Sequence, residues 1–552
     1  MQQNEVLSQL ISHLHFVKDR KEVYITPEIN IVEAMVLHVY GGNSSSVFAA
    51  PSGAARLGEL FVYKDKDATV LLKVIGFEYV STIQEQFLAE MSREGVQAQP
   101  LRLTYAGSPT TLVVTLKPLG EHDGKSVRTF RGTIGPGSQL VEATSADLAF
   151  LERSSGLYFG DVRSGDKRLD TRVRMDAVRT VSEHILIAAT TGRGKSNLLK
   201  TLLWSLLDSP GLGLVVIDPH REYYRVLKDH ENADEKLISF SPNPTPGESY
   251  LAVSTRLIRP VHLTGALSLS EAQEREAELL ARRHSGSADG GNGKGYGEDW
   301  IEALFDGRAF AELEESNKQS DKAAATSRYT LSRKLSRLLS IDTDESYGVF
   351  RLPRTVRKGD LDGSDFLRQV CAAVDAKKVV VVDTSNLSQD AELLLGNLLA
   401  YTLLERRMRS KQLGGDICPA ALVLEEAPRV LSRDSPQNAY MKIAREGRKF
   451  GLGLIAVTQL ISVMPDDILA NLNTKVYLGM ASGKERRAAI DNALNDMTGE
   501  EDELLKLDIG EAILTSSGLG FAIPIKVPLI DELRSASKSD FHFVAPGEKL
   551  EE

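Results

Sequence analysis

The sequence of 552 residues contains only two cysteines, Cys371 and Cys418. Two cysteines cannot form a disulfide framework, and they cannot supply the paired spacing of a structural zinc site. Such scarcity is typical of proteins in a reducing compartment, so we expect a cytoplasmic location.

Long apolar runs are also missing. The first residues, MQQNEVLSQLISHL, lack the basic region followed by an apolar core that marks a secretory signal. No uninterrupted apolar run approaches the roughly 18 residues that a bilayer-spanning helix needs. The sequence therefore predicts a protein that is not integral to a membrane and has no membrane partner.

The chain has no excess of positive charge, because its formal net charge is −10 and its isoelectric point is about 5.7. This balance argues against a basic protein that coats nucleic acid, but it is compatible with a local basic patch or with a basic channel built by an oligomer. The length alone predicts about three to four domain-sized units.

Short β-type runs separated by turn residues fill the N-terminal region and predict a small sheet or barrel. These runs are EVYIT, AMVLHVYGG, GELFVYK, TVLLKVIGFEYV, TLVVTLKPLG and RTFRGTIGPG, with one helical stretch, TIQEQFLAEMSREG, among them. We divide the chain into a short helical extension (1–20), a β-barrel domain (21–165), an α/β domain (166–534) with a helical insertion at about 225–375, and a flexible tail (535–552).

Continuous apolar runs recur in the α/β region, mostly with helical patterns between them. They are HILIAA, LGLVVID, KKVVVVDTS, AALVLEE and GLGLIAVTQ, followed after residue 500 by the further β-type runs DIGEAILTSS and AIPIKVPLI. Runs that are apolar throughout are typical of a parallel sheet buried on both faces. The helical insertion contains the glycine-rich stretch 284–299, which we expect to be a mobile loop.

The stretch AATTGRGKS, residues 188–196, lies between the first apolar run and an amphipathic helical pattern. A phosphate-binding loop needs open backbone N–H groups, a helix N-terminus, a lysine that spans the β- and γ-phosphates and a hydroxyl for Mg²⁺. Gly192 and Gly194 supply the open backbone, Lys195 the cation and Ser196 the hydroxyl. Ala189 replaces the first glycine of the consensus, and an ordinary strand–turn–helix connection is the alternative.

Polar residues follow each of the later apolar runs, where ligands collect in a parallel sheet. Asp218 and Glu222 follow the second run, and the adjacent Glu425 and Glu426 follow the fourth, as in a Walker B strand. We assign Glu426 to the attacking water and Glu425, with Ser196, to the Mg²⁺ shell. The alternative is that these carboxylates only cap helices.

The fifth run ends in Thr458 and Gln459, from which Gln459 is placed to sense the γ-phosphate. Arg445, Arg448 and Lys449 precede this run and are candidates to stabilise transition-state charge, in their own subunit or across an interface, with a solvated helix end as the alternative. Our assignment to ATP binding comprises Thr191, Gly192, Arg193, Gly194, Lys195, Ser196, Asn197 and Asp218, and our catalytic set comprises Lys195, Glu425, Glu426, Arg448 and Gln459.

Together these motifs resemble the HerA family, within the HerA–FtsK superfamily of ring-forming DNA translocases. The resemblance is carried by GLYFG, ATTGRGKSN, VVIDPHREY, LVLEEA, AREGRKFGLGLIAVTQ, ILANLNTKVYLG and DIGEAIL, in family order. It implies a RecA-like P-loop ATPase core preceded by a HAS-barrel-like domain, a homo-hexameric ring around double-stranded DNA, and a NurA-like nuclease or another effector as partner. Arg221 stands where the family often has glycine, and Glu183 where it often has an arginine that acts in trans; Arg179 and Arg448 are the candidate substitutes.

The sequence therefore predicts an ATP- and Mg²⁺-dependent DNA translocase or helicase of HerA type that takes part in DNA-end resection and repair. An ATPase subunit of an antiphage defence complex, a conjugation or secretion motor, and a nucleotide-gated scaffold are the alternatives. The basic stretches 327–337 and 405–411 are candidates for channel contacts with DNA, although a solvated helix face is the simpler interpretation of each.

Overall fold

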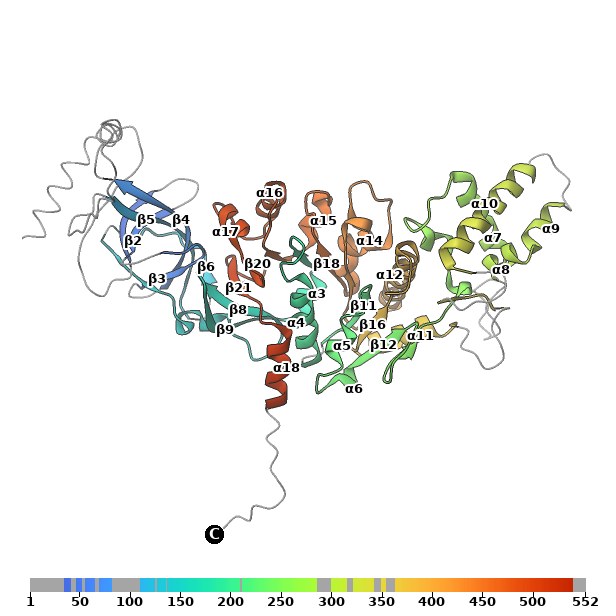
Figure 1. The fold of residues 1–552 in the computed structure, drawn as a ribbon, viewed down its shortest axis with the longest axis horizontal. Helices are drawn as coiled ribbons and strands as arrows, with labels where there is room; N and C mark the ends of the chain where they lie inside the picture. Colours follow the sequence, from blue (N-terminus) through green and yellow to red (C-terminus); the bar gives the residue numbers. More distant parts are fainter. Residues whose placement is uncertain are drawn as a thin grey trace, which may run out of the picture. The chain divides into compact units, whose positions relative to one another are not determined.

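A computed structural model describes most of the chain (Figure 1). The described residues are 34–40, 46–51, 55–64, 69–81, 110–124, 127–135, 137–208, 211–284, 299–314, 321–341, 349–353 and 363–539. Five predictions lie wholly or mainly outside these ranges: the extension at 1–20, the run EVYIT, the helical stretch 82–95, the glycine-rich loop and the end of the tail.

The chain forms two compact units. Unit 1 comprises Met1–Ser154, Phe159–Arg174 and Tyr477–Val527, and unit 2 comprises Ser155–Tyr158, Met175–Val476 and Pro528–Glu552. The segment Tyr477–Val527 therefore groups with the N-terminal strands, although the sequence pattern joins it to the α/β domain.

Unit 1 contains a closed antiparallel sheet. Its strands are β1 (Ala34–Tyr40), β2 (Ser46–Pro51), β3 (Leu60–Lys64), β4 (Thr69–Ser81), β5 (Thr110–His122), β6 (Val127–Arg128) and β7 (Gln139–Glu142). They pair in the order β2-β1-β7-β3-β4-β5-β6, and an additional pairing of β2 with β5 closes the sheet into a small barrel. Val62, Leu72, Val74, Val114 and Leu116 are buried, and the last four of them form part of its core.

The expected β-run RTFRGTIGPG is wrong in this barrel. Only Val127–Arg128 forms a strand, and the following residues up to the start of β7 have no strand assignment where they are described. The segment is rich in glycine, which weakens a strand because it costs backbone entropy and offers no side chain to pack.

The remaining elements of unit 1 come from the middle and the end of the chain. They are β8 (Leu157–Ser164), β9 (Lys167–Met175), α16 (Gly483–Asp491), α17 (Glu501–Lys506), β20 (Glu511–Ser516) and β21 (Ile523–Lys526). The pairs β20–β21 and β21–β8 are antiparallel.

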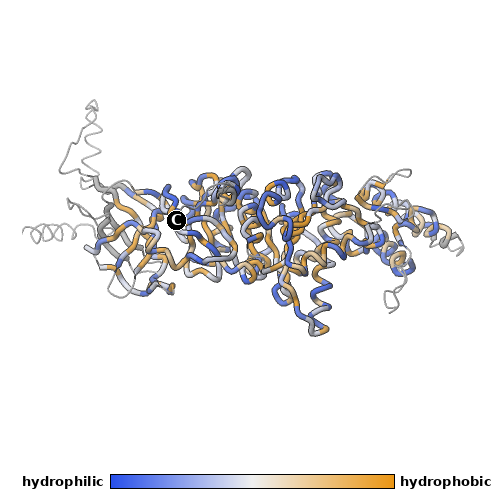
Figure 2. Tube along the Cα trace, turned by 90° about the horizontal axis from the view of Figure 1, so that it is seen from below, coloured by the Kyte–Doolittle hydropathy of each residue, from blue (hydrophilic) through white to orange (hydrophobic). Residues whose placement is uncertain are grey.

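Unit 2 is built on a parallel sheet whose strand order is β13-β12-β16-β11-β17-β18-β10-β19. The strands are β10 (Ile185–Ala188), β11 (Gly213–Asp218), β12 (Leu237–Ser241), β13 (Ser249–Tyr250), β16 (Val379–Asp383), β17 (Ala420–Leu424), β18 (Leu452–Thr458) and β19 (Thr474–Leu478). All five apolar runs predicted from the sequence are strands here, and every residue of β10, β11, β16, β17 and β18 is buried. Figure 2 colours the Cα trace by hydropathy, with hydrophobic residues in orange and hydrophilic residues in blue. The prediction of an α/β fold with a mostly parallel sheet is confirmed.

Helices connect and cover these strands. They include α3 (Ala177–Ser182), α4 (Lys195–Asp208), α5 (Tyr224–Leu227), α6 (Ala233–Lys236), α11 (Phe366–Asp375), α12 (Gln389–Gln412), α13 (Pro428–Leu431), α14 (Ala439–Glu446), α15 (Asp466–Asn471) and α18 (Ile530–Ser539), with the 3₁₀ turn η6 (Gly447–Phe450) before β18. Side chains fix where two of them begin: Ser388 accepts the backbone N–H of Ala391 at α12, and Asn438 accepts that of Met441 at α14.

The region expected to be a helical insertion is partly sheet. Leu237–Ser241 forms β12 at the side of β16, so the helical part begins later in the chain. The helices α7 (Glu271–His284), α8 (Trp300–Phe305), α9 (Arg308–Glu314) and α10 (Asp321–Leu339) contact one another, next to a two-stranded pair of β14 (Val253–Ser254) and β15 (Phe350–Arg351) (Figure 1). Helix α18 extends to Ser539, past the expected start of the tail at 535.

Candidate nucleotide-binding site

The glycine-rich loop leads from β10 into α4. Gly192 has a φ of +79° and Gly194 a φ of +102°, a left-handed region in which a side chain is strained. A Cβ added at Gly192 would meet no heavy atom within 4 Å, so its backbone is open on that side. Ala189 is buried and is not among the described residues with positive φ, which explains why alanine suffices where the consensus has glycine.

Lys195 lies at the start of α4, with Ser196 beside it, where the first N–H groups of the helix have no intrahelical acceptor. Its Nζ donates a hydrogen bond to the carbonyl of Ala189, at 3.0 Å. Burial lowers the pKa of Lys195, and the negative charge of Glu425 opposes that shift. The lysine is therefore half-buried, folded back over the loop and close enough to Glu425 for the two charges to interact.

The carboxyl ends of the strands gather the predicted acidic and polar residues at the same edge of the sheet. In the parallel register, Asp218 of β11 is opposite Asp383 of β16, and Ala188 of β10 is opposite Thr458 of β18. The backbone N–H of Ala189 donates to the carbonyl of Thr458, at 3.2 Å. The end of β18 is thus joined to the start of the phosphate-binding loop.

Gln459 contacts the loop directly. The hydroxyl of Thr191 donates to Oε1 of Gln459, at 2.6 Å. The structure therefore brings together two residues that are 268 positions apart and that the sequence assigned to the same site.

Glu425 is the less exposed carboxylate of the pair that follows β17. Its pKa is raised to about 7, chiefly by burial; a hydrogen bond from Tyr223 opposes this shift, and the nearby charges of Glu222 and Asp218 add to it. Tyr223 is itself buried, and its hydroxyl donates to Oε1 of Glu425. Sequence reasoning missed Tyr223, although it ends the quoted motif DPHREY.

Glu426 differs from its neighbour in exposure. Its side chain is 59% exposed, its φ is +49°, and the guanidinium of Arg429 lies 3.8 Å from its carboxylate. The left-handed backbone at this position turns the chain out of the strand, so two adjacent carboxylates have different surroundings. Glu425 is partly buried near Lys195, whereas Glu426 is exposed to water.

Asp218 is fully buried and holds the loop that follows β11. Its carboxylate accepts the backbone N–H groups of His220, Glu222 and Tyr223 at distances of 3.0–3.3 Å. Burial raises its pKa, and these three hydrogen bonds oppose the shift. Glu222 pairs with Lys200 of α4 at 2.6 Å, so the same loop is attached to the helix behind the phosphate-binding loop.

Arg448 is not brought to this edge of the sheet. It lies in η6, before β18, and pairs with Glu183 at 2.8 Å, while Arg445 pairs with Asp467 at 2.7 Å. The seven residues of β18 span roughly 23 Å at the usual rise of a strand and separate Arg448 from Gln459. Arg179 approaches the same Glu183, at 3.4 Å.

Asn197 is engaged away from the loop. Its side-chain N–H donates to the carbonyl of Pro528 at 2.7 Å, and its Oδ1 accepts the N–H of Ile530 at 3.0 Å. Its predicted contact with nucleotide, like that of Arg193 in the loop, stays a prediction.

The donor set suits a metal that is shared with phosphates. Among the residues that the structure describes, no three or more His, Cys, Asp or Glu side chains are grouped to hold a metal ion by themselves. Mg²⁺ is usually held by one or two protein oxygens together with substrate phosphates and water. Ser196 and Glu425 fit that pattern.

No helix within the described ranges is long and apolar enough to cross a bilayer.

Comparison with known proteins adds three findings. Residues 157–402 match the family model described as the central domain of helicase HerA. The DNA double-strand break repair helicase HerA of Pyrococcus furiosus is 22% identical over 88% of this chain and 90% of its own length, and that of Sulfolobus acidocaldarius is 26% identical over 78% and 80%. The solved structure of VirB4 of Thermoanaerobacter pseudethanolicus is 19% identical, covers 68% of this chain and 98% of that chain, and has a TM-score of 0.45.

Proposed function

This chain belongs to the HerA family, and on that premise we propose that it hydrolyses ATP to move along double-stranded DNA as a homo-hexameric ring. The observation that carries the proposal is the convergence of Lys195, Glu425 and Gln459 around one glycine-rich loop. A strand–turn–helix connection without function has no need of a buried carboxylate with a pKa near 7 beside a lysine whose pKa is lowered.

The roles follow from the surroundings of each side chain. The open backbone at Gly192 and Gly194 and the N-terminus of α4 receive the phosphates, and Lys195 leaves the Ala189 carbonyl to reach the β- and γ-oxygens. Ser196 and Glu425 would hold Mg²⁺, and the ion would supply positive charge against the charge that develops during phosphoryl transfer.

Glu426 is the candidate for orienting or deprotonating the attacking water, because it is open to solvent and its neighbour is not. Gln459 would report whether the γ-phosphate is present, since that phosphate would compete with Oε1 of Gln459 for the hydroxyl of Thr191. Asp218 and Tyr223 position the machinery, one through the loop backbone and the other through Glu425.

Arg448 would act in trans. Its distance from the phosphate-binding loop of its own chain supports a contact with the nucleotide of a neighbouring subunit, after exchange of its ion pair with Glu183.

A NurA-like nuclease or another effector would be the protein partner of the ring. A defence complex, a conjugation motor and a nucleotide-gated scaffold would use the same ATPase site, and no contact among the described residues favours them.

Two substitutions test the assignment. Lys195→Ala should abolish nucleotide binding, whereas Glu426→Gln should keep ATP binding and lower kcat by about 10²–10⁴-fold, as expected for loss of a general base. Lys442→Ala, at an exposed position of α14, is the matched control and should hydrolyse ATP normally. Near-normal turnover by the Glu426→Gln variant would overturn the catalytic assignment.

Movement along double-stranded DNA requires a separate measurement. ATPase activity of the unsubstituted protein should increase with duplex DNA, and the protein should displace a third strand from one end of a triplex in an ATP-dependent manner. Mass photometry in the presence of ATP should give the mass of six chains. Hydrolysis that ignores duplex DNA and moves no third strand would leave the nucleotide-gated scaffold in its place.

A further inference from the structure

A second cavity of unit 2 lies at the other edge of the parallel sheet. It has a volume of about 1250 Å³ and is bounded by α11, the C-terminal turns of α12, the segment from Leu257 to His262 and the segment from Asp416 to Pro419. Lys377 and Pro419, which line it, precede β16 and β17, whereas the nucleotide site lies where these strands end. The two sites therefore occupy opposite edges of the sheet.

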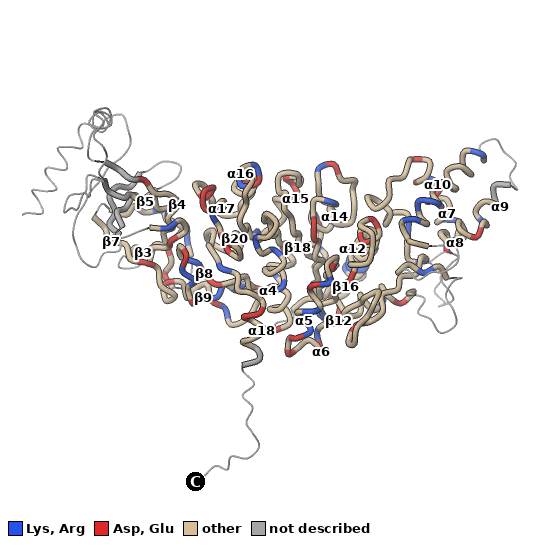
Figure 3. The backbone as a smooth tube through the Cα atoms, in the orientation of Figure 1, with Lys and Arg blue, Asp and Glu red and all other residues tan. Residues whose placement is uncertain are grey.

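Cationic side chains dominate the lining. Six of them face three carboxylates, Asp375, Glu405 and Asp416, which leaves an excess of three positive charges. The six cations are Arg259, Arg368, Lys377, Arg406, Arg407 and Arg409. This excess stands out in a chain whose net charge is −10 and whose charges of both signs are otherwise interspersed along both units (Figure 3).

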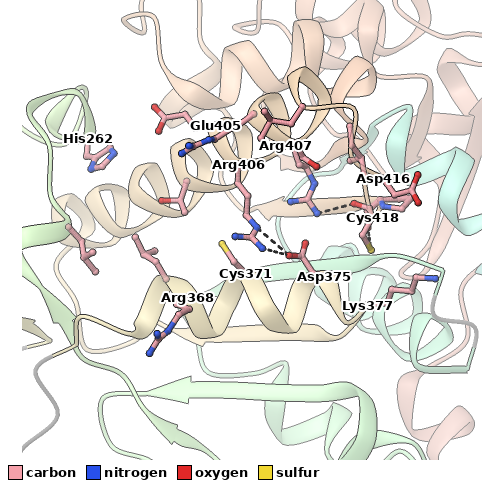
Figure 4. A pocket seen from close by; sticks show the side chains of 18 of the residues that line it. His262, Arg368, Cys371, Asp375, Lys377, Glu405, Arg406, Arg407, Asp416 and Cys418 are labelled. Atoms are coloured by element: carbon pink, nitrogen blue, oxygen red, sulfur yellow. Dashed lines mark hydrogen bonds and ion pairs between the residues drawn. The ribbon is translucent and has the colours of Figure 1, made fainter. Parts of the chain in front are cut away.

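Two of the three carboxylates of the cavity are already paired with arginines. Arg259 pairs with Glu405 at 2.8 Å, and Arg406 pairs with Asp375 at 2.6 Å. Figure 4 shows Arg406 and Arg407 extending from α12 into the space above α11, with Arg406 directed at Asp375.

Arg407 has no such partner. It is 3% exposed, and its single hydrogen bond in the described structure runs from Nη2 to the carbonyl of Cys418, at 3.0 Å. Its Nε and Nη1 are buried and have no hydrogen-bond acceptor among the described residues. Burial lowers the pKa of this guanidinium, which is the direction expected for a cation without a matching anion.

A buried guanidinium with two unpaired N–H donors destabilises the folded protein unless an anion pairs with it. An N–H of a guanidinium forms a strong, charge-assisted hydrogen bond with a phosphate oxygen. The backbone phosphates of a DNA duplex are flanked by sugars and neighbouring residues, so they are poorly shaped to enter a recess and reach a side chain that is 97% buried. A small molecule with a terminal phosphate meets both requirements, and the cavity volume is ample for one.

We propose that this cavity binds a phosphate-bearing small molecule, with a phosphate oxygen that accepts from Nη1 of Arg407 and further anionic groups near Arg409 and Lys377. The ligand is either an inorganic oligophosphate or a nucleotide, which share this chemistry. The site is separate from the ATPase site and would be occupied whether or not the glycine-rich loop holds ATP.

The cysteines of this chain provide the readout. Cys371 and Cys418 both line the cavity and are the chain's two cysteines, and Cys418 is the more exposed of them. Full-length protein carrying Lys195→Ala, to silence the loop, is titrated with inorganic triphosphate, with ADP or with a duplex oligonucleotide. Binding is followed by calorimetry, and alkylation of Cys418 by N-ethylmaleimide is followed by mass spectrometry.

Triphosphate or ADP should bind and slow the alkylation of Cys418. Arg407→Gln should weaken that binding by roughly tenfold or more, as expected for the loss of a charge-assisted hydrogen bond. Arg433→Gln, at an exposed arginine that pairs with Asp466 on another surface, is the matched control and should bind normally. The tighter of the two ligands identifies the source of the phosphate.

Three outcomes would overturn the proposal: neither small molecule protects Cys418, only the duplex does, or a folded Arg407→Gln variant binds as tightly as its parent. If Arg407→Gln does not fold, the exposed Arg409→Gln variant decides instead, and unchanged affinity in that variant is equally contrary. ATP hydrolysis enters none of these measurements, so a failure here is distinct from a failure of the proposed ATPase function.

Discussion

The two units of the molecule each bury a cluster of charges, and the clusters differ in how their charges are matched. In unit 1, Lys73, Lys117 and Arg163 meet Glu500 and Glu503. In unit 2, Lys195, Glu425 and Asp218 gather around the glycine-rich loop. Burial is common to both, so burial alone does not distinguish a structural cluster from a functional one.

The cluster of unit 1 is closely paired. Lys73 lies 2.6 Å from Glu500 and 3.2 Å from Glu503, and Arg163 also pairs with Glu503. Burial pushes the pKa of Lys73 down, but the two carboxylates outweigh it and raise the pKa overall. Burial likewise pushes the pKa of Glu503 up, and Lys73 and Arg163 bring it below its ordinary value. Lys73 and Glu503 are therefore stabilised as ions by their neighbours, whereas burial keeps the pKa of Glu500 raised in spite of Lys73 and Lys117.

In the cluster of unit 2, the neighbouring charges do not compensate for burial. Burial lowers the pKa of Lys195 and raises that of Glu425, and the mutual attraction of the two does not compensate for it. Ionised groups without compensating charges in the fold are available to bind a ligand that supplies the opposite charge. The contrast teaches that mismatched buried charges, rather than buried charges as such, mark the functional site.

Removing one partner of the matched cluster should have the largest effect on stability. Glu503→Ala leaves Lys73 and Arg163 with too little negative charge in a buried site, which should lower the free energy of unfolding of unit 1 by about 3–5 kcal/mol. Urea denaturation followed by circular dichroism measures the change. A loss below about 1 kcal/mol would mean that the cluster is hydrated and that the comparison fails.

The mismatched cluster should respond to pH instead. Because Glu425 has a pKa of about 7, it is mostly protonated at pH 6 and ionised at pH 8, so turnover that needs its carboxylate should rise across that interval. Tyr223→Phe removes a hydrogen bond that lowers this pKa. The rise should then move by about one unit to higher pH, as the loss of a hydrogen bond to a charged group predicts.

The profile of the Tyr223→Phe variant is measured as kcat against pH at saturating ATP. Tyr224→Phe is the matched control, since Tyr223 and not Tyr224 donates a hydrogen bond to Glu425, and removal of the Tyr224 hydroxyl should leave the profile in place. A midpoint that stays fixed, or that moves to lower pH, in the Tyr223→Phe variant would contradict the role given to this hydroxyl.

An exposed ion pair should show the smallest effect. The guanidinium of Arg433 lies 3.0 Å from the carboxylate of Asp466, but the two side chains are 58% and 79% exposed. Asp466→Ala should therefore change the free energy of unfolding by no more than about 1 kcal/mol, and less at high salt. A loss as large as that of Glu503→Ala would show that burial does not set the scale.

Much of the α/β fold was predictable because β10, β11, β16, β17 and β18 are continuous apolar runs, and continuous runs fit only a sheet that is covered on both faces. Strand β12 was missed because LISFS is short, only partly buried and directly preceded by the helix formers ADEK. The run RTFRGTIGPG was wrong because its apolar residues were counted without weighing its glycines.

The site was predictable where chemistry follows a strand, as at Lys195, Glu425 and Gln459. It was not predictable where a role depends on a contact between distant residues. Nothing near Tyr223 in the sequence indicates that its hydroxyl reaches Glu425, 202 positions away. The position of Arg448 beside Glu183 likewise follows from the parallel register, which sends η6 to one edge of the sheet and Gln459 to the other. The assigned roles of these residues stay predictions.

The amide of Asn197 gives the C-terminal helix an importance that no motif announces. By binding Pro528 and Ile530, it attaches the first turn of α4, directly behind the glycine-rich loop, to the beginning of α18. A chain shortened to residue 527 would lose this tether while retaining every recognisable ATPase signature, whereas one shortened to residue 539 would keep it. Residues 528–539 are in this sense an anchor for the phosphate-binding end of the molecule.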